Sequence, residues 1–481
     1  MSTVSIQIKH SGKTYQVDVD TEEKGEVFKH QLYSLTGVPP ERQKILIKGG
    51  QLKDDTIMSS LNLKPNQTVM MLGTAGELPK EPAQKMQFVE DMNQEQIAKK
   101  QVVPNGLINM GNTCYLNSTL QALRTVPELK DELNKYSGGG GISSLDLTAS
   151  LRDLYKDMNR TTEAFPPLAF LNALRQSFPQ FQERGDDGQF KQQDAEEAWS
   201  GILQSLRNNL GPFVDSYFGG KFETELKCDE TDEPAQTGVE EFSKLNCHIS
   251  KDTNFLRDGL MEGLEEKIEK HNESLGRNAQ YTLKKRVSRL PKYLTVHFIR
   301  FFWKRDVGKK SKILRKVQFP FNYDATELCT TELQEKLVPA REKYRDVERE
   351  ILELKRAAKR AKYQELDGEL SKDVNKEGEL SAEKKADLDK QLAESVHADL
   401  KSEPSCNSTG LYQLHAIVTH KGPDADSGHY QCFVRNEQSE NKWWKFNDDK
   451  ITEVDDDKVE MLAGGGESDS ALILLYKAVS V

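Results

Sequence analysis

The sequence predicts an α+β protein of at least two domains, and three features of the chain lead to this prediction. Its 481 residues exceed the roughly 250–300 residues that one hydrophobic core usually serves. Strand patterns around a single helix occupy the first 75 residues, whereas helical patterns followed by strand patterns occupy most of the remainder. A polar, charged stretch at residues 76–103 separates the two parts and is typical of a linker.

Composition and charge exclude several classes of function. The net charge of −10 argues against nucleic acid as the main partner. We expect no membrane span, because no apolar run is long enough, and the N-terminus does not resemble a signal peptide. The six cysteines are sparse and irregularly spaced, which indicates reduced thiols. We therefore expect a cytoplasmic protein and leave the nucleus open as a second location.

Residues 1–75 are predicted to form a small β-grasp domain. Apolar residues alternate at 4–8 and again at 15–19, with a polar turn between them. A helix is expected at 26–35, ended by Gly37 and stopped by the prolines at 39 and 40. A further strand follows at 45–47, before a turn at 49–50.

Residues 104–478 are predicted to form the second domain. Apolar residues at helical spacing predict helices at 119–133, 145–158, 165–178 and 193–206. Strand patterns follow at 217–226, 242–249, 281–283, 293–302 and 312–319, and again at 411–419, 442–446 and 471–476. Residues 330–405 are rich in Glu, Lys, Arg, Ala and Asp, and we interpret them as an insertion. We expect an amphipathic helix over 344–361 and a mobile, solvated segment over 367–404.

The segment from Gly106 to Asn117 carries one cysteine, Cys114, between a glycine-containing turn and an apolar helical pattern. A helix N-terminus offers unpaired N–H groups that favour thiolate over thiol, so this position suits a nucleophile. Asn109 lies just upstream, where its side-chain amide is placed to donate to an oxyanion.

A candidate base lies far downstream, at His429 in the sequence Asp-Ser-Gly-His-Tyr. Asn447 and Asp448 follow it and are candidates to orient the imidazole through Nδ1. Cys first, His later and Asn or Asp last is one order that a thiol hydrolase can use. His415 and His420 are rivals, but neither has the Gly-His-Tyr context.

These blocks resemble the Cys and His boxes of the ubiquitin-specific protease family of cysteine deubiquitinases. Two further stretches, Gln192–Glu197 and Leu290–Phe301, also resemble that family. The resemblance implies a papain-like core with fingers, palm and thumb, and ubiquitin and ubiquitinated proteins as partners. It also implies Asn447 as the orienter, Asp448 as an auxiliary carboxylate, and no cofactor. The residues that would grip the ubiquitin tail are Gln193, Asp194 and Glu197.

The first 75 residues resemble ubiquitin itself, most closely over Gly37–Gln43. The terminal Gly-Gly of ubiquitin is missing, because the stretch from Leu72 runs Leu-Gly-Thr-Ala-Gly-Glu, so a fixed domain is expected. Leu46 and Leu72 fall where ubiquitin has its apolar recognition patch. The domain order resembles the proteasome-associated branch of the family, which implies docking to the regulatory particle of the 26S proteasome.

Three further expectations concern metal, activity and regulation. Many family members bind zinc with two Cys-x-x-Cys pairs, but only Cys228 and Cys247 occur here, so no metal site is predicted. A largely non-catalytic ubiquitin-binding scaffold on the proteasome remains the alternative function. Finally, Trp303–Lys316 and Lys421–Gly428 are polar, glycine-containing stretches that we expect to gate the tail channel and to approach each other through opposite charges.

Overall fold

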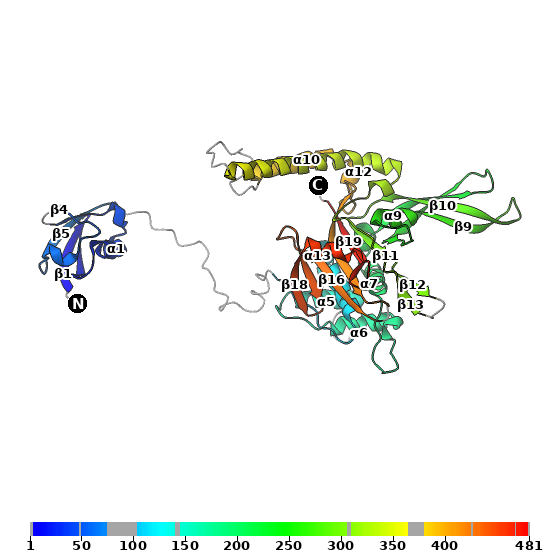
Figure 1. Cartoon of the computed structure of the whole chain (residues 1–481), viewed down its shortest axis with the longest axis horizontal. Helices are drawn as coiled ribbons and strands as arrows, with labels where there is room; N and C mark the ends of the chain where they lie inside the picture. Colours follow the sequence, from blue (N-terminus) through cyan, green and yellow to red (C-terminus); the bar gives the residue numbers. More distant parts are fainter. Residues whose placement is uncertain are drawn as a thin grey trace. The chain divides into compact units, whose positions relative to one another are not determined.

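The computed structural model describes residues 3–47, 50–74, 103–139, 145–304, 309–363, 380–424, 427–466 and 468–479. Two compact units are present, Met1–Asp91 and Met92–Val481, and each is described by itself (Figure 1). Within the described ranges, no helix has both the length and the apolar character needed to cross a membrane.

The N-terminal unit is the predicted β-grasp domain. Its elements are β1 (Thr3–His10), β2 (Lys13–Asp20), α1 (Gly25–Thr36), η1 (Pro40–Arg42), β3 (Lys44–Ile47), β4 (Gly50–Gln51), η2 (Met58–Leu61) and β5 (Thr68–Leu72). The strand order is β2-β1-β5-β3-β4, with β1 parallel to β5. Alternate residues of β1 and β2 point inward and pack on Phe28 and Leu32 of α1. The alternation and the helix at 26–35 are therefore confirmed.

The first part of the second unit is helical. It contains α3 (Cys114–Leu123), α4 (Pro127–Lys135), α5 (Leu147–Met158), α6 (Leu168–Ser177), η4 (Pro179–Gln182), α7 (Ala195–Asn209) and α8 (Phe213–Tyr217). The single helix expected at 119–133 is wrong, because the chain makes two helices there. Pro127 lacks an N–H, so it interrupts a continuing helix and instead begins α4.

A large sheet in the order β18-β17-β16-β15-β19-β11-β8 forms the centre of this unit, and β14 pairs with β15. The strands are β8 (Leu245–Cys247), β11 (Tyr293–Phe298), β14 (Asn322–Asp324), β15 (Leu411–Lys421), β16 (His429–Arg435), β17 (Lys442–Asn447), β18 (Lys450–Asp455) and β19 (Ser470–Ala478). One face packs on the helices through residues such as Val418 and Cys432. The other face buries Leu414, Ile417 and Phe433 in a second core.

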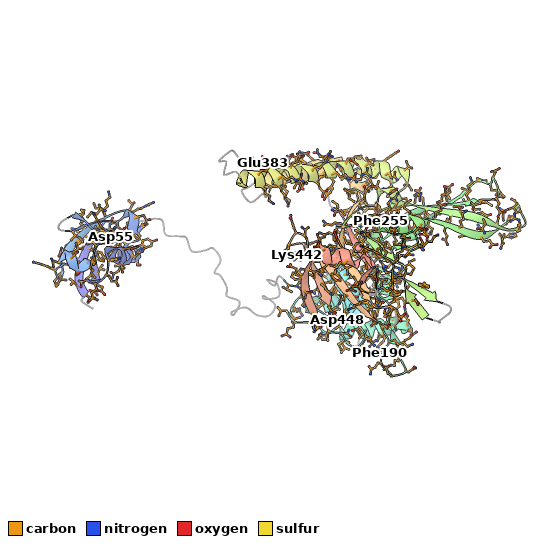
Figure 2. The ribbon with its side chains drawn as sticks, viewed as in Figure 1. Asp55, Phe190, Phe255, Glu383, Lys442 and Asp448 are labelled. Atoms are coloured by element: carbon orange, nitrogen blue, oxygen red, sulfur yellow. The ribbon has the colours of Figure 1, made fainter. Side chains whose placement is uncertain are left out.

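A separate sheet projects from the second unit as a long ribbon (Figure 1). It consists of β6 (Gly220–Cys228), β7 (Gln236–Phe242), β9 (Glu265–Asn272) and β10 (Arg277–Arg289), in the order β7-β6-β10-β9. Side chains stand out on both of its faces (Figure 2). The sequence missed β7 and β9, because these strands are exposed along most of their length and lack an apolar alternation. It placed only three residues of β10, although Ala279, Tyr281 and Val287 of that strand are buried.

Two further predictions need correction. The strand expected at 312–319 is wrong, because strand structure there ends with β13 (Lys309–Lys312), which pairs with β12 (Phe301–Lys304). In the insertion, α10 (Thr331–Tyr363) confirms the amphipathic helix, but α11 (Ala382–Ser395) and α12 (Ala398–Lys401) occupy part of the segment expected to be mobile. Leu388 and Leu392 of α11 bury against Val347 of α10, which supports this ordering. Residues 367–379 lie outside the described ranges.

Short helices complete the unit: α9 (Leu256–Glu262), η5 (Thr326–Leu328), α13 (Asp456–Glu460) and η6 (Met461–Ala463).

Candidate active site

The turn before α3 is closed by its own side chains. Oδ1 of Asn109 accepts hydrogen bonds from the N–H groups of Gly111 (2.9 Å) and Thr113 (3.2 Å). The hydroxyl of Thr113 accepts from the N–H of Met110 at 2.8 Å. These bonds fix the backbone immediately before Cys114, which is the first residue of α3.

Cys114 is buried, with 1% of its surface exposed. The N–H of Tyr430 donates to its sulfur at 3.5 Å, and the thiol donates to Oε1 of Gln192 at 3.5 Å. Burial raises the pKa of the Cys114 thiol to about 11; the N–H of Tyr430 lowers the pKa, and the carboxylate of Asp448 raises it. The resting sulfur is therefore a neutral thiol.

His429 begins β16 and contacts Asn447, the last residue of β17, at 2.5 Å between Nε2 and Oδ1. The carbonyl oxygen of Asn447 can only accept, so Nε2 carries the hydrogen and Nδ1 is left as the acceptor. The expectation that Asn447 would bind Nδ1 is corrected in this respect. This tautomer leaves Nδ1 as the nitrogen able to take a proton from a thiol.

The residue before His429 has to be glycine. Gly428 has φ of +122°, and a Cβ there would lie 2.3 Å from the carbonyl oxygen of Lys421. Nε2 of Gln192 donates to the carbonyl oxygen of Gly428 at 3.0 Å. Since Gln192 also accepts from Cys114, one side chain connects the thiol to the turn that carries His429.

Asp448 does not contact the imidazole in the described interactions. It has φ of +53°, which turns its carboxylate toward the start of α3, where Oδ2 accepts from Nδ2 of Asn109 (3.0 Å) and Oδ1 accepts from Nδ2 of Asn117 (2.8 Å). Its carbonyl oxygen accepts from the N–H of Leu107 at 3.0 Å. A Cβ at Gly106 would lie 2.6 Å from that same carbonyl oxygen, so glycine permits this close approach.

Asn109 therefore has one amide hydrogen bound to Asp448 and a second that makes no hydrogen bond among the described residues. Its side chain is exposed and lies next to the Cys114 turn. Asp448 thus holds in place the side chain that was expected to donate to an oxyanion.

Cys114 and His429 belong to neighbouring segments but do not bond to each other directly. Both Cys114 and His429 lie in described ranges, and no hydrogen bond joins them. The rival histidines are elsewhere on β15 and are buried. Burial lowers the pKa of His415 to about 4 and that of His420 to about 3, with Lys477 and Lys312 respectively contributing in the same direction.

The predicted tail-binding residues precede and begin α7. Asp194 is its N-cap, and its carboxylate accepts from the N–H of Glu196 at 2.8 Å. Glu197 lies in the first turn, and Gln193 is half-buried beside Asp194. Burial, and then the charges of Asp194 and Glu197, raise the pKa of the Tyr430 hydroxyl far above its usual range. The two carboxylates therefore lie close to the residue that donates to Cys114.

The two stretches expected to gate the channel do meet. The N–H of Lys312 donates to the carbonyl oxygen of Pro423 at 2.9 Å, and its ammonium donates to the carbonyl oxygen of His420 at 2.6 Å. Ser311 also pairs with Asp424 as an isolated β-bridge. These described contacts use main-chain oxygens; much of the charge of both stretches lies on side chains outside the described residues, so the approach through opposite charges stays a prediction.

Sequence reasoning missed three residues. Gln192 and Tyr430 contact the sulfur, but a single sequence does not distinguish Gln192 from its neighbour Gln193. In the N-terminal unit, Met70 is 50% exposed, like Leu72, and lies opposite Leu46 in the pairing of β3 with β5. Strand alternation could have been used to predict that Met70 lies on the same face as Leu46 and Leu72.

Among the described residues, no group of three or more His, Cys, Asp or Glu side chains is arranged to hold a metal. Cys228 packs in the projecting sheet, and Cys247 belongs to the core of the large sheet.

Comparison with known proteins identifies the family. The model of the ubiquitin carboxyl-terminal hydrolase family matches residues 105–476, and that of the ubiquitin family matches residues 6–76. The chain belongs to the ubiquitin carboxyl-terminal hydrolase family. It is accordingly a thiol-dependent deubiquitinase with an N-terminal ubiquitin-like domain.

Three relatives are similar to this chain over nearly their whole length. Ubiquitin carboxyl-terminal hydrolase 6 of Schizosaccharomyces pombe is 45% identical over 99% of each chain. Ubiquitin carboxyl-terminal hydrolase 7 of Arabidopsis thaliana is 39% identical over 99% of each chain. Ubiquitin carboxyl-terminal hydrolase 14 of Caenorhabditis elegans is 35% identical over 98% of this chain and 93% of its own.

Proposed function

We propose that this deubiquitinase uses Cys114 as its nucleophile and His429 as its base, and that it works at the proteasome. The observation that carries the catalytic assignment is the position of the thiol. Its sulfur lies at the start of α3, directly under the N–H of Tyr430, the residue that follows His429 in the chain. Asn447 orients the imidazole, and Asn109 donates to the oxyanion.

The reaction is acyl transfer to sulfur and then to water. Nδ1 of His429 takes the proton of Cys114, and the sulfur attacks the carbonyl carbon of the C-terminal glycine of ubiquitin. Asn109 stabilises the resulting oxyanion. The C–N bond breaks as the imidazolium gives its proton to the departing amine, and water then hydrolyses the thioester, which releases ubiquitin and restores the thiol.

We assign recognition of ubiquitin to the start of α7 and to a channel beside it. Gln193, Asp194 and Glu197 at the start of α7 would bind the tail of ubiquitin, whose arginines complement the two carboxylates. A narrow channel beside them would select the Gly-Gly end by excluding larger side chains.

Docking to the regulatory particle of the 26S proteasome is assigned to the ubiquitin-like domain. Leu46, Met70 and Leu72 are 46%, 50% and 50% exposed and lie on one face of β3 and β5. Three neighbouring exposed apolar side chains favour a protein-binding surface over a plain spacer. We also assign the protein to the cytoplasm, as the sparse cysteines predict.

One observation favours a second function. The resting thiol is buried, its pKa is raised to about 11, and it makes no hydrogen bond to His429 among the described contacts. A free enzyme in this state would be slow, so a ubiquitin-binding scaffold that is activated only on the proteasome fits the same geometry.

The test is reaction of the purified full-length chain with ubiquitin that carries a C-terminal electrophile, with and without purified proteasome. We expect a covalent adduct at Cys114 that forms faster when the proteasome is present. No adduct under either condition would leave only the scaffold function.

The docking surface is tested by co-purification of the chain with the proteasome, using a variant that combines Leu46→Asp and Leu72→Asp. We expect loss of co-purification with the proteasome. Leu35→Asp is the matched control, because Leu35 on α1 is also 47% exposed. Equal loss with the control would contradict the assigned surface.

A further inference from the structure

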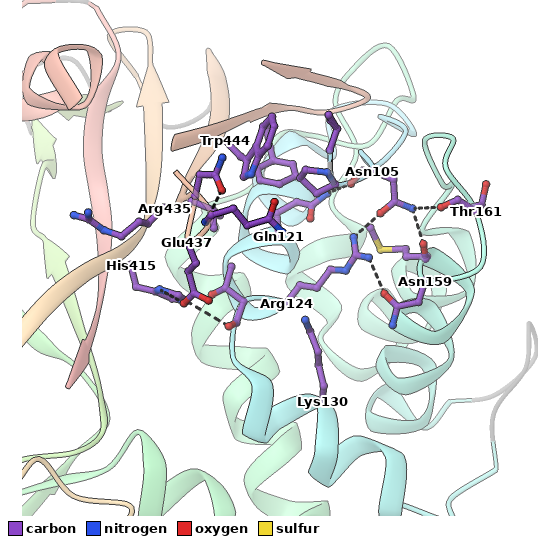
Figure 3. Close-up of a pocket in the computed structure, with 18 of the residues that line it drawn as sticks. Asn105, Gln121, Arg124, Lys130, Asn159, Thr161, His415, Arg435, Glu437 and Trp444 are labelled. Carbon is purple, nitrogen blue, oxygen red and sulfur yellow. Dashed lines mark hydrogen bonds and ion pairs between the residues drawn. The ribbon is translucent and has the colours of Figure 1, made fainter. Parts of the chain in front are cut away.

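A second cavity, of about 810 Å³, lies at the opposite end of α3 from Cys114 (Figure 3). Its walls are the end of α3, the start of α4, the end of α5 and the strands β15 to β17. The ten residues of α3 span roughly 15 Å, so the cavity is separate from the candidate active site. Its volume lies in the usual range for small-molecule pockets, about 300–1,000 Å³.

Cationic side chains dominate the lining of this cavity. Arg124, Lys130, Lys156 and Arg160 line it, whereas Glu437 is the one carboxylate among its lining residues. Arg435 also lines it, but its guanidinium points away and lies over Trp443 (Figure 3). A positive lining stands out on a chain with a net charge of −10, because general composition does not account for it.

Lys130 is the least compensated of the cations that line the cavity. Its half-buried ammonium extends toward Arg124 (Figure 3) and forms no hydrogen bond or ion pair with any residue that the structure describes. Burial, and then the charge of Arg124, lower the pKa of Lys130. Glu437 offers little compensation, because its carboxylate lies 3.4 Å from the ammonium of Lys477.

Arg124 is held rigidly at the same site. Its guanidinium donates to Oδ1 of Asn105 at 2.6 Å and to Oδ1 of Asn159 at 2.9 Å. Neither partner is charged, so these bonds fix the orientation of the group and leave its positive charge unneutralised. A guanidinium has five N–H donors, and those not bound to the two amides remain for a ligand. Fixed donors bind an anion at a lower entropic cost than mobile ones.

We propose that this cavity binds a small soluble polyphosphate, either a nucleoside triphosphate or an inositol polyphosphate, with its phosphates between Lys130 and Arg124. Several phosphate charges match the lining cations Arg124, Lys130 and Lys156, whereas a single carboxylate would leave most of them unpaired. Arg160 is already paired with Asp157 at 3.6 Å. Lys156 at the rim adds attraction that salt screens. The half-buried indole of Trp444 offers an apolar wall on the opposite side.

The cavity touches the elements that form the candidate site. Gln121 and Arg124 belong to or directly follow α3, which begins with Cys114; Val434 lies on β16, which begins with His429. Binding at the cavity does not depend on the catalytic assignment, so the two are tested separately.

The test is isothermal titration calorimetry of the full-length chain with inositol hexakisphosphate, with ATP without magnesium, and with inorganic phosphate. We expect at least one of the two polyphosphates to bind clearly tighter than inorganic phosphate, with affinity falling as salt is raised. Lys130→Gln should weaken that binding by roughly tenfold or more, the usual value of a charge-assisted hydrogen bond.

The matched control is Lys135→Gln, because Lys135 lies on the same helix but is paired with Glu132 at its surface. It should bind as the unsubstituted chain does, and the melting temperatures of both variants without ligand should be unchanged. Absence of binding by both polyphosphates would overturn the proposal. Equal weakening by both substitutions would do the same, because it would show unspecific attraction to the surface.

Discussion

The two halves of the candidate site are supported in different ways. The half that carries Cys114 is held by a dense polar network, in which Asn109, Thr113 and Asp448 fix the turn and the start of α3. The half that carries His429 depends on one side-chain contact, to Asn447, and on a glycine turn tied to Gln192. The nucleophile is therefore placed firmly, whereas the base has more freedom to be moved by a partner.

The largest effect should come from removing the sulfur atom of Cys114, which lies in the more firmly held half of the site. Cys114→Ala should lower hydrolysis of a ubiquitin conjugate by about 10⁴-fold or more, as when a triad nucleophile is removed. Ubiquitin affinity, measured by calorimetry, should change little because a small thiol adds little to a broad interface.

Cys228→Ala serves as the control, since Cys228 packs in the projecting sheet. Residual turnover of Cys114→Ala within tenfold of the unsubstituted enzyme would exclude the assigned nucleophile.

The next prediction compares Asn447, which contacts His429, with its neighbour Asp448, which holds Asn109. Asn447→Ala should lower kcat by about 10²-fold, because the imidazole loses its orienting contact. Asp448→Ala should lower kcat by less, because it acts through the position of Asn109. Asp449→Ala, at an exposed neighbour, should leave kcat within about twofold.

The pH profile distinguishes them further. Loss of Asn447 should change the shape of the plot of kcat against pH. Loss of Asp448 should lower kcat at every pH and leave that shape unchanged. If Asp448→Ala reduces kcat more than Asn447→Ala, the division between the halves is wrong.

These two residues also show what sequence could and could not predict. The motif placed Asn447 and Asp448 next to each other, and both were expected near the imidazole. The positive φ of Asp448 sends its carboxylate to the opposite half of the site, and backbone conformation of this kind is not visible in residue order. Cys114 was predictable because it combines a glycine turn with a helix start, and the structure has both.

The same limit applies to the fold. Apolar runs predicted β15 and β19 well, since most of their residues are buried on both faces. The pattern failed for β9, whose sequence EEKIEKHN is almost wholly polar, because pairing with β10 and not burial holds this edge strand in the sheet. The break between α3 and α4 was missed because the apolar spacing continues across Pro127, while the absent N–H ends the helix.

The next prediction concerns how much thiolate Cys114 carries in the free enzyme. With its pKa raised from 9.0 to about 11, Cys114 should carry roughly 100-fold less thiolate at neutral pH than an ordinary cysteine. A raised pKa means that alkylation by iodoacetamide should keep accelerating as pH rises through 9 and 10. Peptide mapping by mass spectrometry would measure the rate at Cys114 alone, with a short peptide of the same sequence as reference.

A rate that levels off below pH 8 would show a resting thiolate. The base half would then already be engaged in the free enzyme, and the contrast between the halves would disappear.

The smallest effect concerns the contact between the two gating stretches. Lys312→Ala removes the bond from its ammonium to the carbonyl oxygen of His420, the residue directly before the second stretch, which should raise the turnover of the free enzyme by a few fold. The stimulation by proteasome should shrink by the same factor. Lys316→Ala, outside these contacts, is the control. Slower turnover of Lys312→Ala with unchanged stimulation would contradict a restraining role for the contact.

The bond between the N–H of Leu107 and the carbonyl oxygen of Asp448 also constrains when activity can arise during synthesis. The nucleophile leaves the ribosome early, but the partners that orient the base and hold Asn109 come more than 300 residues later. At roughly 5–20 residues per second, the growing chain carries an incomplete site for tens of seconds. A nascent chain therefore cannot remove ubiquitin from its surroundings, and the thiol becomes competent only after the strands from β15 to β17 have closed over α3.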